Sequence, residues 1–384
     1  MAFHITVFDQ LLSSLRQLNF EDIVSKHHEG AKPRKFDHWS QLVSMVFCQF
    51  TGASSIRDLM INFNARKKMH YHWRTKILKK STLADANHDR HYKPFEVLFY
   101  KALSLHKKGM RKKIEELTYI IDSTTIDLCL SLFPWAHFRK SKGAVKMHTL
   151  LEANTSIPKC VVVTDGKKHD LKPGKYLASK TPKGSILLVD KAYIDFQWLS
   201  QLNASSRFFV TRAKKNMSFK VIKNLPLESQ PGVVSDQIII LSNEKYPETM
   251  RLVTFNDVAN GKIYHFMTNI FNLDAKTISG LYKQRWEIEL FFKWIKQNLK
   301  IKKFLGRSKN SILIQIYTAL LVYILTAYIR KFSKTKFGFL KTYRTIKANL
   351  FERVNILELL NPKPEPPQEV ENQRLPLLNF CTGQ

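Results

Sequence analysis

Residues 275–299 read AKTISGLYKQRWEIELFFKWIKQNL, and the architecture of the chain can be worked out from this stretch. Apolar residues recur at helical spacing, which predicts one continuous helix with Asp274 as its N-cap. At about 100° per residue, four polar side chains fall within an arc of roughly 60° beside the apolar stripe. They are Tyr282, Arg285, Glu289 and Lys296. The helix can pack on a sheet while its flank presents these groups together, although an ordinary i,i+4 ion pair would also explain the Arg and the Glu.

Two apolar strands are each followed by an aspartate. Thr118–Ile121 leads into Asp122, and Ser185–Val189 leads into Asp190. An aspartate after a strand commonly serves a turn or a cap, but together with Glu289 these residues supply three carboxylates. Two carboxylates about 4 Å apart repel by roughly 4 kcal/mol at an effective dielectric near 20, so three converging carboxylates require cations. Hard oxygen ligands favour Mg²⁺ or Mn²⁺, and a pair of such ions suits phosphodiester chemistry.

The segments around these aspartates alternate between strands and helices. Met147–Leu151 and Cys160–Thr164 are predicted strands, and the turn residues between them predict a hairpin. A helix around Phe196–Leu202 and a strand at Arg207–Thr211 follow the second aspartate. This alternation predicts an α/β fold whose sheet has mixed strand directions.

Residues from about 213 to 268 predict a β-rich insertion. Short β-like runs at Val233–Leu241, Met250–Phe255 and Lys262–Thr268 are separated by turn residues, without a long helix. Further along the chain, the tail from Asn361 onward is rich in proline, which predicts an extended or disordered segment.

Residues 1 to about 110 are predicted to be mostly helical, because apolar residues recur at helical spacing in several stretches. Ser54 or Ser55 is expected to cap a helix over Ile56–Phe63. A basic patch without acidic residues follows, with two aromatic residues interleaved. Its members are Arg66, Lys67, Lys68, Arg74, Lys76, Lys79 and Lys80, with Tyr71 and Trp73. The patch favours DNA contact, and the alternative is a solvated charged surface.

The charge of the whole chain supports an anionic partner. Its 384 residues include 62 Lys plus Arg against 31 Asp plus Glu, a net charge of +31. Nucleic acid is the expected partner, because phosphate neutralisation releases condensed counterions. The cysteines form no Cys-x-x-Cys pair and the N-terminus lacks the pattern of a secretion signal, so a cytoplasmic location is expected. The long apolar run Ile312–Ile329 is interpreted as a buried core helix rather than a membrane span.

The spaced polar residues of the helix also match a known signature. Tyr282-x2-Arg285-x3-Glu289-x6-Lys296 agrees, position for position, with the Y-x2-R-x3-E-x6-K signature of the IS-four branch of insertion-sequence DDE transposases. The chain resembles this family over roughly residues 35–330. The segments that carry the rest of the resemblance are Ile121–Thr125, Lys146–His148, Thr164–Asp170, Leu188–Tyr193 and the helical region 36–105.

The resemblance implies a fold and a domain organisation. It implies a ribonuclease-H-like catalytic core over residues 111–345, interrupted by the β-rich insertion. A helical DNA-binding domain would occupy residues 1–110, and a C-terminal segment would occupy residues 346–384.

The resemblance also implies roles for the six site residues. Asp122, Asp190 and Glu289 would bind Mg²⁺ or Mn²⁺, as two ions. The three other residues of the signature would contact DNA phosphates, which suits the fork of an arginine, the point charge of a lysine and the single donor of a phenol. Those three are Tyr282, Arg285 and Lys296.

The implied activity is cut-and-paste DNA transposition in a bacterial cytoplasm, without a membrane partner. The enzyme would bind double-stranded DNA at terminal inverted repeats, cleave it, and transfer the freed strands to target DNA as a homodimer or a larger assembly. Two alternatives remain open: a ribonuclease-H-fold nuclease that cuts without joining, and an inactive DNA-binding relative.

Two departures from the family pattern bear on the mechanism. The family has Arg-Gly-Tyr after its second aspartate, and this chain has Lys191-Ala192-Tyr193. Some relatives stack a flipped base on a tryptophan of the insertion, and here no tryptophan lies between Trp198 and Trp286. Three aromatic residues of the insertion could stack a base instead, namely Phe255, Tyr264 and Phe266. Near the expected site, His148 and His169 are interpreted as structural histidines, and Asp170 as a residue that could assist locally without being a metal ligand.

Overall fold

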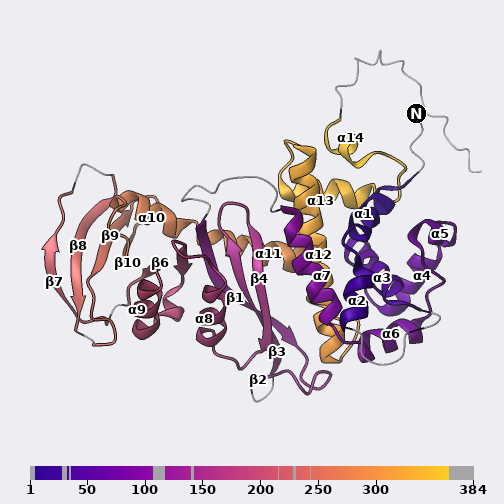
Figure 1. Ribbon diagram of the computed structural model, residues 1–384, viewed down its shortest axis with the longest axis horizontal. Coiled ribbons are helices and arrows are strands. Elements are labelled where there is room, and N and C mark those ends of the chain that lie inside the picture. The colour runs from indigo at the N-terminus through magenta and orange to yellow at the C-terminus, as the bar shows by residue number, and fades with distance from the viewer. Residues whose placement is uncertain are drawn as a thin grey trace, which may run out of the picture.

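Figure 1 shows the computed structural model, which describes residues 5–27, 33, 36–106, 117–139, 142–214, 216–227, 231–242 and 244–362. Nearly all of the predicted proline-rich tail lies outside the described residues. Strands make one twisted sheet, and the helices of the N-terminal and C-terminal parts of the chain gather at one end of it (Figure 1).

Helices form the described N-terminal part of the chain, as predicted. Ser55 caps one of them, its side chain accepting the N–H of Asp58. The helices are α1 (Val7–Arg16), α2 (Phe20–His27), α3 (His38–Thr51), α4 (Ile56–Asn64), α5 (His70–Trp73), α6 (Lys80–Asp89) and α7 (Lys93–Leu103).

The long apolar run forms the central helix of this helical body, α12 (Lys309–Ser333). Its length and composition would suit a membrane span, but 89% of its most apolar window is buried inside the protein. It packs against α3, α6 and α7. The buried Gln315 amide donates to the carbonyls of Lys300 (2.6 Å) and Lys303 (2.9 Å), so the polar group is satisfied. The prediction of a core helix is confirmed.

Helices from both ends of the chain share this core. α13 (Phe339–Ala348) and α14 (Ile356–Leu360) follow α12 and lie beside it (Figure 1). The backbone N–H groups of Val7 and Phe8 donate to the carbonyls of Glu352 and Leu350. The first helix is therefore held against the segment after α13.

The sheet order is β2-β3-β1-β5-β6-β10-β9-β8-β7, with β4 also paired to β3. The strands β1, β5 and β6 are parallel, whereas β3 runs antiparallel to β1 and β4 antiparallel to β3. The order β4-β3-β1-β5-β6, with one reversed strand, is that of a ribonuclease-H-like core and confirms the predicted fold class. The bounds are β1 (Thr118–Leu128), β2 (His137–Arg139), β3 (Lys142–Glu152), β4 (Ile157–Asp165), β5 (Ile186–Val189) and β6 (Phe208–Arg212).

Helices cover both faces of this core. One face packs against α8 (Leu171–Ser179) and α9 (Phe196–Ala204) through buried residues such as Ile121 and Val189. The other face, which includes Ile120 and Leu188, joins the core of the helical body. The predicted hairpin of β3 and β4 is confirmed.

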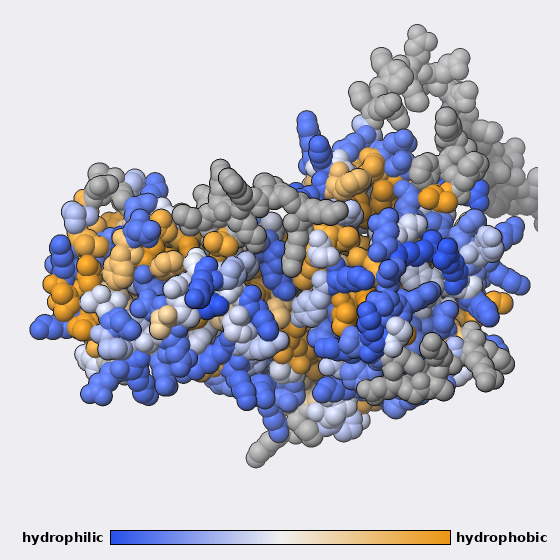
Figure 2. Space-filling model, viewed as in Figure 1, coloured by the Kyte–Doolittle hydropathy of each residue, from blue (hydrophilic) through white to orange (hydrophobic). Residues whose placement is uncertain are grey.

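Strands β7 to β10 extend the same sheet between β6 and the next helix, because β10 pairs with β6. The predicted runs at Val233–Leu241 and Lys262–Thr268 are β8 and β10, and β9 spans Met250–Asp257. β7 (Phe219–Asn224) was not predicted, and all six of its residues are exposed at the sheet edge. Figure 2 shows hydrophobic residues gathered at this outer end of the sheet.

The prediction of one continuous helix over residues 275–299 is wrong at one point. The stretch forms α10 (Ala275–Lys283) and α11 (Trp286–Asn298), and Asp274 caps the first as expected. At the junction the N–H of Arg285 donates to the carbonyl of Tyr282 (3.0 Å), three residues back. This tighter turn accompanies two contacts made by its flanking residues: Tyr282 packs on Phe266, and Arg285 reaches two carboxylates.

Candidate active site

The two strand-borne aspartates lie side by side. β1 and β5 are adjacent parallel strands in which Ile121 is paired with Val189, and Asp122 and Asp190 are the next residues on each strand. Because neighbouring strands are about 4.8 Å apart, the two aspartates are close to each other in the sheet. Each accepts the N–H of the residue that follows it, at 2.7 Å.

Glu289 reaches this edge from α11, and Arg285 joins it to the first aspartate. The Arg285 guanidinium donates to Glu289 Oε1 at 2.6 Å and lies 3.7 Å from Asp122 Oδ2. Its side chain is 11% exposed, so it is a largely buried cation between two carboxylates. The structure therefore brings the helical glutamate to the strand-borne aspartates, with a guanidinium as the bridge.

The three carboxylates influence one another through space. The pKa of Asp122 is raised from 3.8 to about 6, mainly because the carboxyl group is buried. The negative charges of Asp190 and Glu289 act in the same direction, and the Ser123 N–H and Arg285 act against it. At Asp190, burial acts in the same direction, but the Arg212 hydrogen bond and the Lys191 N–H outweigh it and lower the pKa. The site thus concentrates negative charge that the arginines offset only in part.

Arg212 is a functional candidate that the sequence interpretation missed. Its guanidinium donates to Asp190 Oδ1 at 3.1 Å. The register of the parallel strands places it there, since Leu188 pairs with Val210 and both chains continue by two residues. The sequence signal for it was a basic residue at the end of β6, the strand that follows Asp190 along the chain.

The other two signature residues are more enclosed than phosphate ligands would suggest. The Tyr282 ring packs on Phe266, with centroids 4.9 Å apart, and the residue is buried beside the guanidinium groups of Arg212 and Arg285. Burial raises the pKa of Tyr282. The Lys296 ammonium donates to the Thr125 carbonyl on β1 at 2.8 Å. Lys296 therefore fastens α11 to the strand that carries Asp122.

The donor chemistry of the site fits divalent metal ions, whereas the present arrangement keeps the donors apart. Carboxylate oxygens are the ligands that Mg²⁺ and Mn²⁺ prefer, and the pKa of Asp122 is raised mainly by burial, with the charges of Asp190 and Glu289 adding to the effect. Within the described part of the chain, no three His, Cys, Asp or Glu side chains are gathered closely enough to hold an ion. Arg285 occupies the position between Asp122 and Glu289, so ion binding requires that its guanidinium move.

The turn after the second aspartate does not depend on glycine. Residues Lys191–Tyr193 form a 3₁₀ turn, and Ala192 is not among the residues with positive φ. The expected difference from the family at this turn therefore causes no backbone strain. Tyr193 is buried, and its ring lies against Gly174 of α8, where an added Cβ would come within 2.8 Å.

The aromatic residues near the site differ in exposure. Phe266, proposed above as a base-stacking residue, is buried and packed on Tyr282, so that interpretation is wrong for this ring. Tyr264 and Phe255 are half-buried and keep some accessible surface. Trp286, which follows Arg285, is 59% exposed at the start of α11.

The basic patch of the N-terminal helices is mostly accessible. Arg66 is half-buried, with its guanidinium over the Phe351 ring at 3.8 Å. Trp73 is fully buried among other aromatic rings and cannot contact DNA, whereas Tyr71 is 86% exposed. The remaining basic members are exposed, namely Lys67, Lys68, Arg74, Lys76, Lys79 and Lys80.

Two family matches account for much of the chain. Residues 114–325 match the family described as Transposase DDE domain, which is more than half of the chain. Residues 3–73 match a domain of unknown function, DUF4372. The chain belongs to the DDE transposase family. Membership implies DNA binding and dependence on a divalent metal ion.

Named relatives agree with this assignment. The chain is 30% identical to "Putative transposase y4zB" of Sinorhizobium fredii, over 74% of this chain and 81% of the relative. It is 32% identical to "Probable transposase for insertion sequence element IS5377" of Geobacillus stearothermophilus, over 54% and 55%. It is 24% identical to "Putative transposase for insertion sequence element IS4SA" of Synechocystis, over 73% and 80%. A solved piggyBac transposase synaptic complex with hairpin DNA matches with a TM-score of 0.45 and 12% identity, over 93% of this chain and 81% of that one.

Proposed function

We propose that Asp122, Asp190 and Glu289 are the catalytic carboxylates of this transposase and hold two Mg²⁺ or Mn²⁺ ions. The observation that carries the proposal is the register of β1 and β5, which sets the two aspartates side by side, with α11 adding the glutamate through Arg285. When bound, such ions supply positive charge at the scissile phosphate and favour an oxygen nucleophile. Water and a DNA 3′-hydroxyl can both serve as that nucleophile, so one site suits cleavage and joining.

The arginines give the site a way to respond to DNA. Arg285 and Arg212 offset part of the negative charge of the carboxylates in the protein alone. Guanidinium groups fork onto phosphate oxygens as readily as onto carboxylates. A DNA end that enters the site would draw Arg285 away from Glu289 and free the carboxylate oxygens. Tyr282 and Lys296 would then contact the same DNA phosphates.

The N-terminal helices supply the proposed DNA-end recognition. The exposed lysines of the basic patch and the protruding Tyr71 combine charge with a flat ring, which suits phosphate contact beside a base or sugar. The substrate proposed for them is the terminal inverted repeat of the element, bound by a homodimer that pairs two ends in the bacterial cytoplasm.

A single reaction separates this function from its two alternatives. The purified chain is incubated with Mg²⁺, an oligonucleotide carrying the element end, and a supercoiled plasmid. Oligonucleotide joined to plasmid is the expected product. Cleavage without joining would identify a nuclease, and binding without either product would identify an inactive DNA-binding relative.

A further inference from the structure

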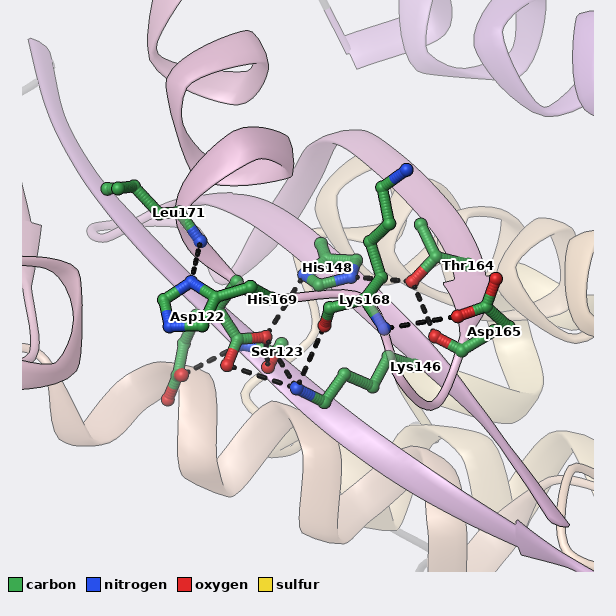
Figure 3. A network of polar contacts seen from close by, with 10 residues as sticks. Asp122, Ser123, Lys146, His148, Thr164, Asp165, Lys168, His169 and Leu171 are labelled. Atoms are coloured by element: carbon green, nitrogen blue, oxygen red, sulfur yellow. Dashed lines mark hydrogen bonds and ion pairs between the residues drawn. The ribbon is translucent and has the colours of Figure 1, made fainter. Parts of the chain in front are cut away.

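A fourth carboxylate, Asp170, lies next to the site without belonging to it. It stands at the N-terminus of α8, where it makes no side-chain cap, so its oxygens are free for other partners. Ser123 Oγ donates to Asp170 Oδ1 at 2.7 Å. Lys146 Nζ donates to both oxygens, at 3.1 and 3.2 Å. Figure 3 shows the surrounding network of polar contacts, with Ser123, Lys146 and His148 labelled.

The partners of Asp170 are themselves held in place. His148 of β3 is fully buried; its Nε2 pairs with Thr164 Oγ1 at 2.9 Å, and its Nδ1 lies 3.5 Å from Asp170 Oδ1. Burial lowers the pKa of His148 to about 4, although Asp170 acts against this, so the ring is neutral at neutral pH. Lys146 is 15% exposed and also donates to the carbonyl of Lys168 at 3.3 Å. Three elements, β1, β3 and α8, therefore meet at one carboxylate.

This network connects to the first catalytic carboxylate through one residue. Ser123 follows Asp122 on β1, and successive strand residues point to opposite faces. The Ser123 hydroxyl is anchored to Asp170 on the α8 face, while its backbone N–H donates to Asp122 Oδ1 at 2.7 Å. The anchored hydroxyl thereby restrains the donor that orients the Asp122 carboxylate.

We propose that Asp170 is a positioning residue that, through Ser123, fixes the Asp122 carboxylate in the orientation for binding a metal ion. This rests on the proposed role of Asp122. Outer partners of metal ligands commonly change metal affinity by about 10–100-fold when removed. Asp170 is not itself a ligand in this account, since Ser123 and Lys146 already engage its oxygens.

The test compares variants that keep or remove the serine hydroxyl. Mn²⁺ binding to the full chain in complex with an element-end oligonucleotide is measured by electron paramagnetic resonance. Ser123→Ala and Asp170→Asn are expected to weaken Mn²⁺ binding by about 10–100-fold, and the double variant no further than the stronger single one. Ser123→Thr, which retains the hydroxyl, is expected to stay within about threefold of the unaltered protein.

Matched controls separate positioning from folding and from the catalytic assignment. Asp165→Asn removes a nearby carboxylate that accepts the N–H of Lys168 (3.1 Å), and it should leave Mn²⁺ binding unchanged. DNA affinity in EDTA and the melting temperature should be equal in Ser123→Ala and Ser123→Thr. Mn²⁺ affinity equal in those two variants would overturn the positioning role. Normal Mn²⁺ binding by Asp122→Asn would contradict the proposed catalytic site itself, rather than the positioning role of Asp170.

Discussion

Replacing Asp122 by asparagine should make the metal-free protein more stable at about pH 8. Burial and neighbouring carboxylates raise the pKa of Asp122 from 3.8 to about 6, so the folded state binds this proton more tightly than the unfolded chain. For a raised carboxyl pKa, stability falls as the pH rises through that interval, and the whole penalty is present above it. At 1.36 kcal/mol per pKa unit, the penalty is about 3 kcal/mol at most, because the carboxylate is 23% exposed and partly screened.

The measurement is thermal unfolding in EDTA at several pH values. Roughly 1–3 kcal/mol would raise the melting temperature by a few degrees, at about 2–4 °C per kcal/mol for domains of 150–250 residues. The difference between Asp122→Asn and the unaltered chain should shrink as the pH falls through that interval and vanish at about pH 3 or below, where the carboxyl group is protonated in both the folded and the unfolded chain. Asp127→Asn removes the same charge from an exposed position of β1 and should shift stability by no more than about 0.5 kcal/mol. A melting temperature of Asp122→Asn at pH 8 that is equal to or lower than that of the unaltered protein would refute the reasoning.

Three further outcomes follow from the same contacts. Arg285→Gln should raise the Mn²⁺ affinity of the DNA-free protein severalfold, because it releases Glu289, and it should impair cleavage. Mn²⁺ affinity that calorimetry finds unchanged would argue against the bridging role of Arg285. Replacing Lys67 and Lys68 by alanine should weaken DNA binding and reduce the slope of log affinity against log salt by about 0.9 per lost phosphate contact; an unaltered slope would place DNA elsewhere. Arg251→Ala should destabilise the fold by about 3–5 kcal/mol, because it strands the buried Asp236 partner now 2.6 Å away; a melting curve like that of the unaltered chain would contradict this.

Much of the catalytic core could be predicted because its strands are short apolar runs in a polar chain. Asp122 and Asp190 stand out since each follows such a run, and their adjacency then depends only on two parallel strands being neighbours. The apolar stripe beside Glu289 was equally visible and is buried as expected. Local pattern was enough here because the carboxylates and the hydrophobic residues that position them are close in sequence.

Features set by tertiary contacts could not be predicted in this way. The helix break before Trp286 leaves good helix-forming residues on both sides, and it accompanies contacts with a distant strand and Asp122. Trp73 lies among lysines in the sequence, yet its indole is buried with Phe8 and Phe47. β7 is exposed along its whole length, so the alternation of apolar and polar residues that marks a half-buried strand is missing.

The role of Asp170 shows the same limit at the site itself. The resemblance places Asp170, 48 residues after Asp122, near the expected site, but it does not show that Ser123 connects the two. The link becomes visible only when β1, β3 and α8 are placed together.

The central claim is that three carboxylates act together on one scissile phosphate. Its most direct test is strand cleavage of an element-end oligonucleotide by Asp122→Asn, Asp190→Asn and Glu289→Gln, each with its DNA affinity measured in parallel. Glu287→Gln, on the same helix, serves as the control, because its carboxylate is engaged by Ser156 at 3.0 Å, away from the aspartates. Loss of Mg²⁺-dependent cleavage in all three variants, with DNA affinity retained and the control active, is the predicted result. Cleavage that persists in any one of the three would contradict the assignment.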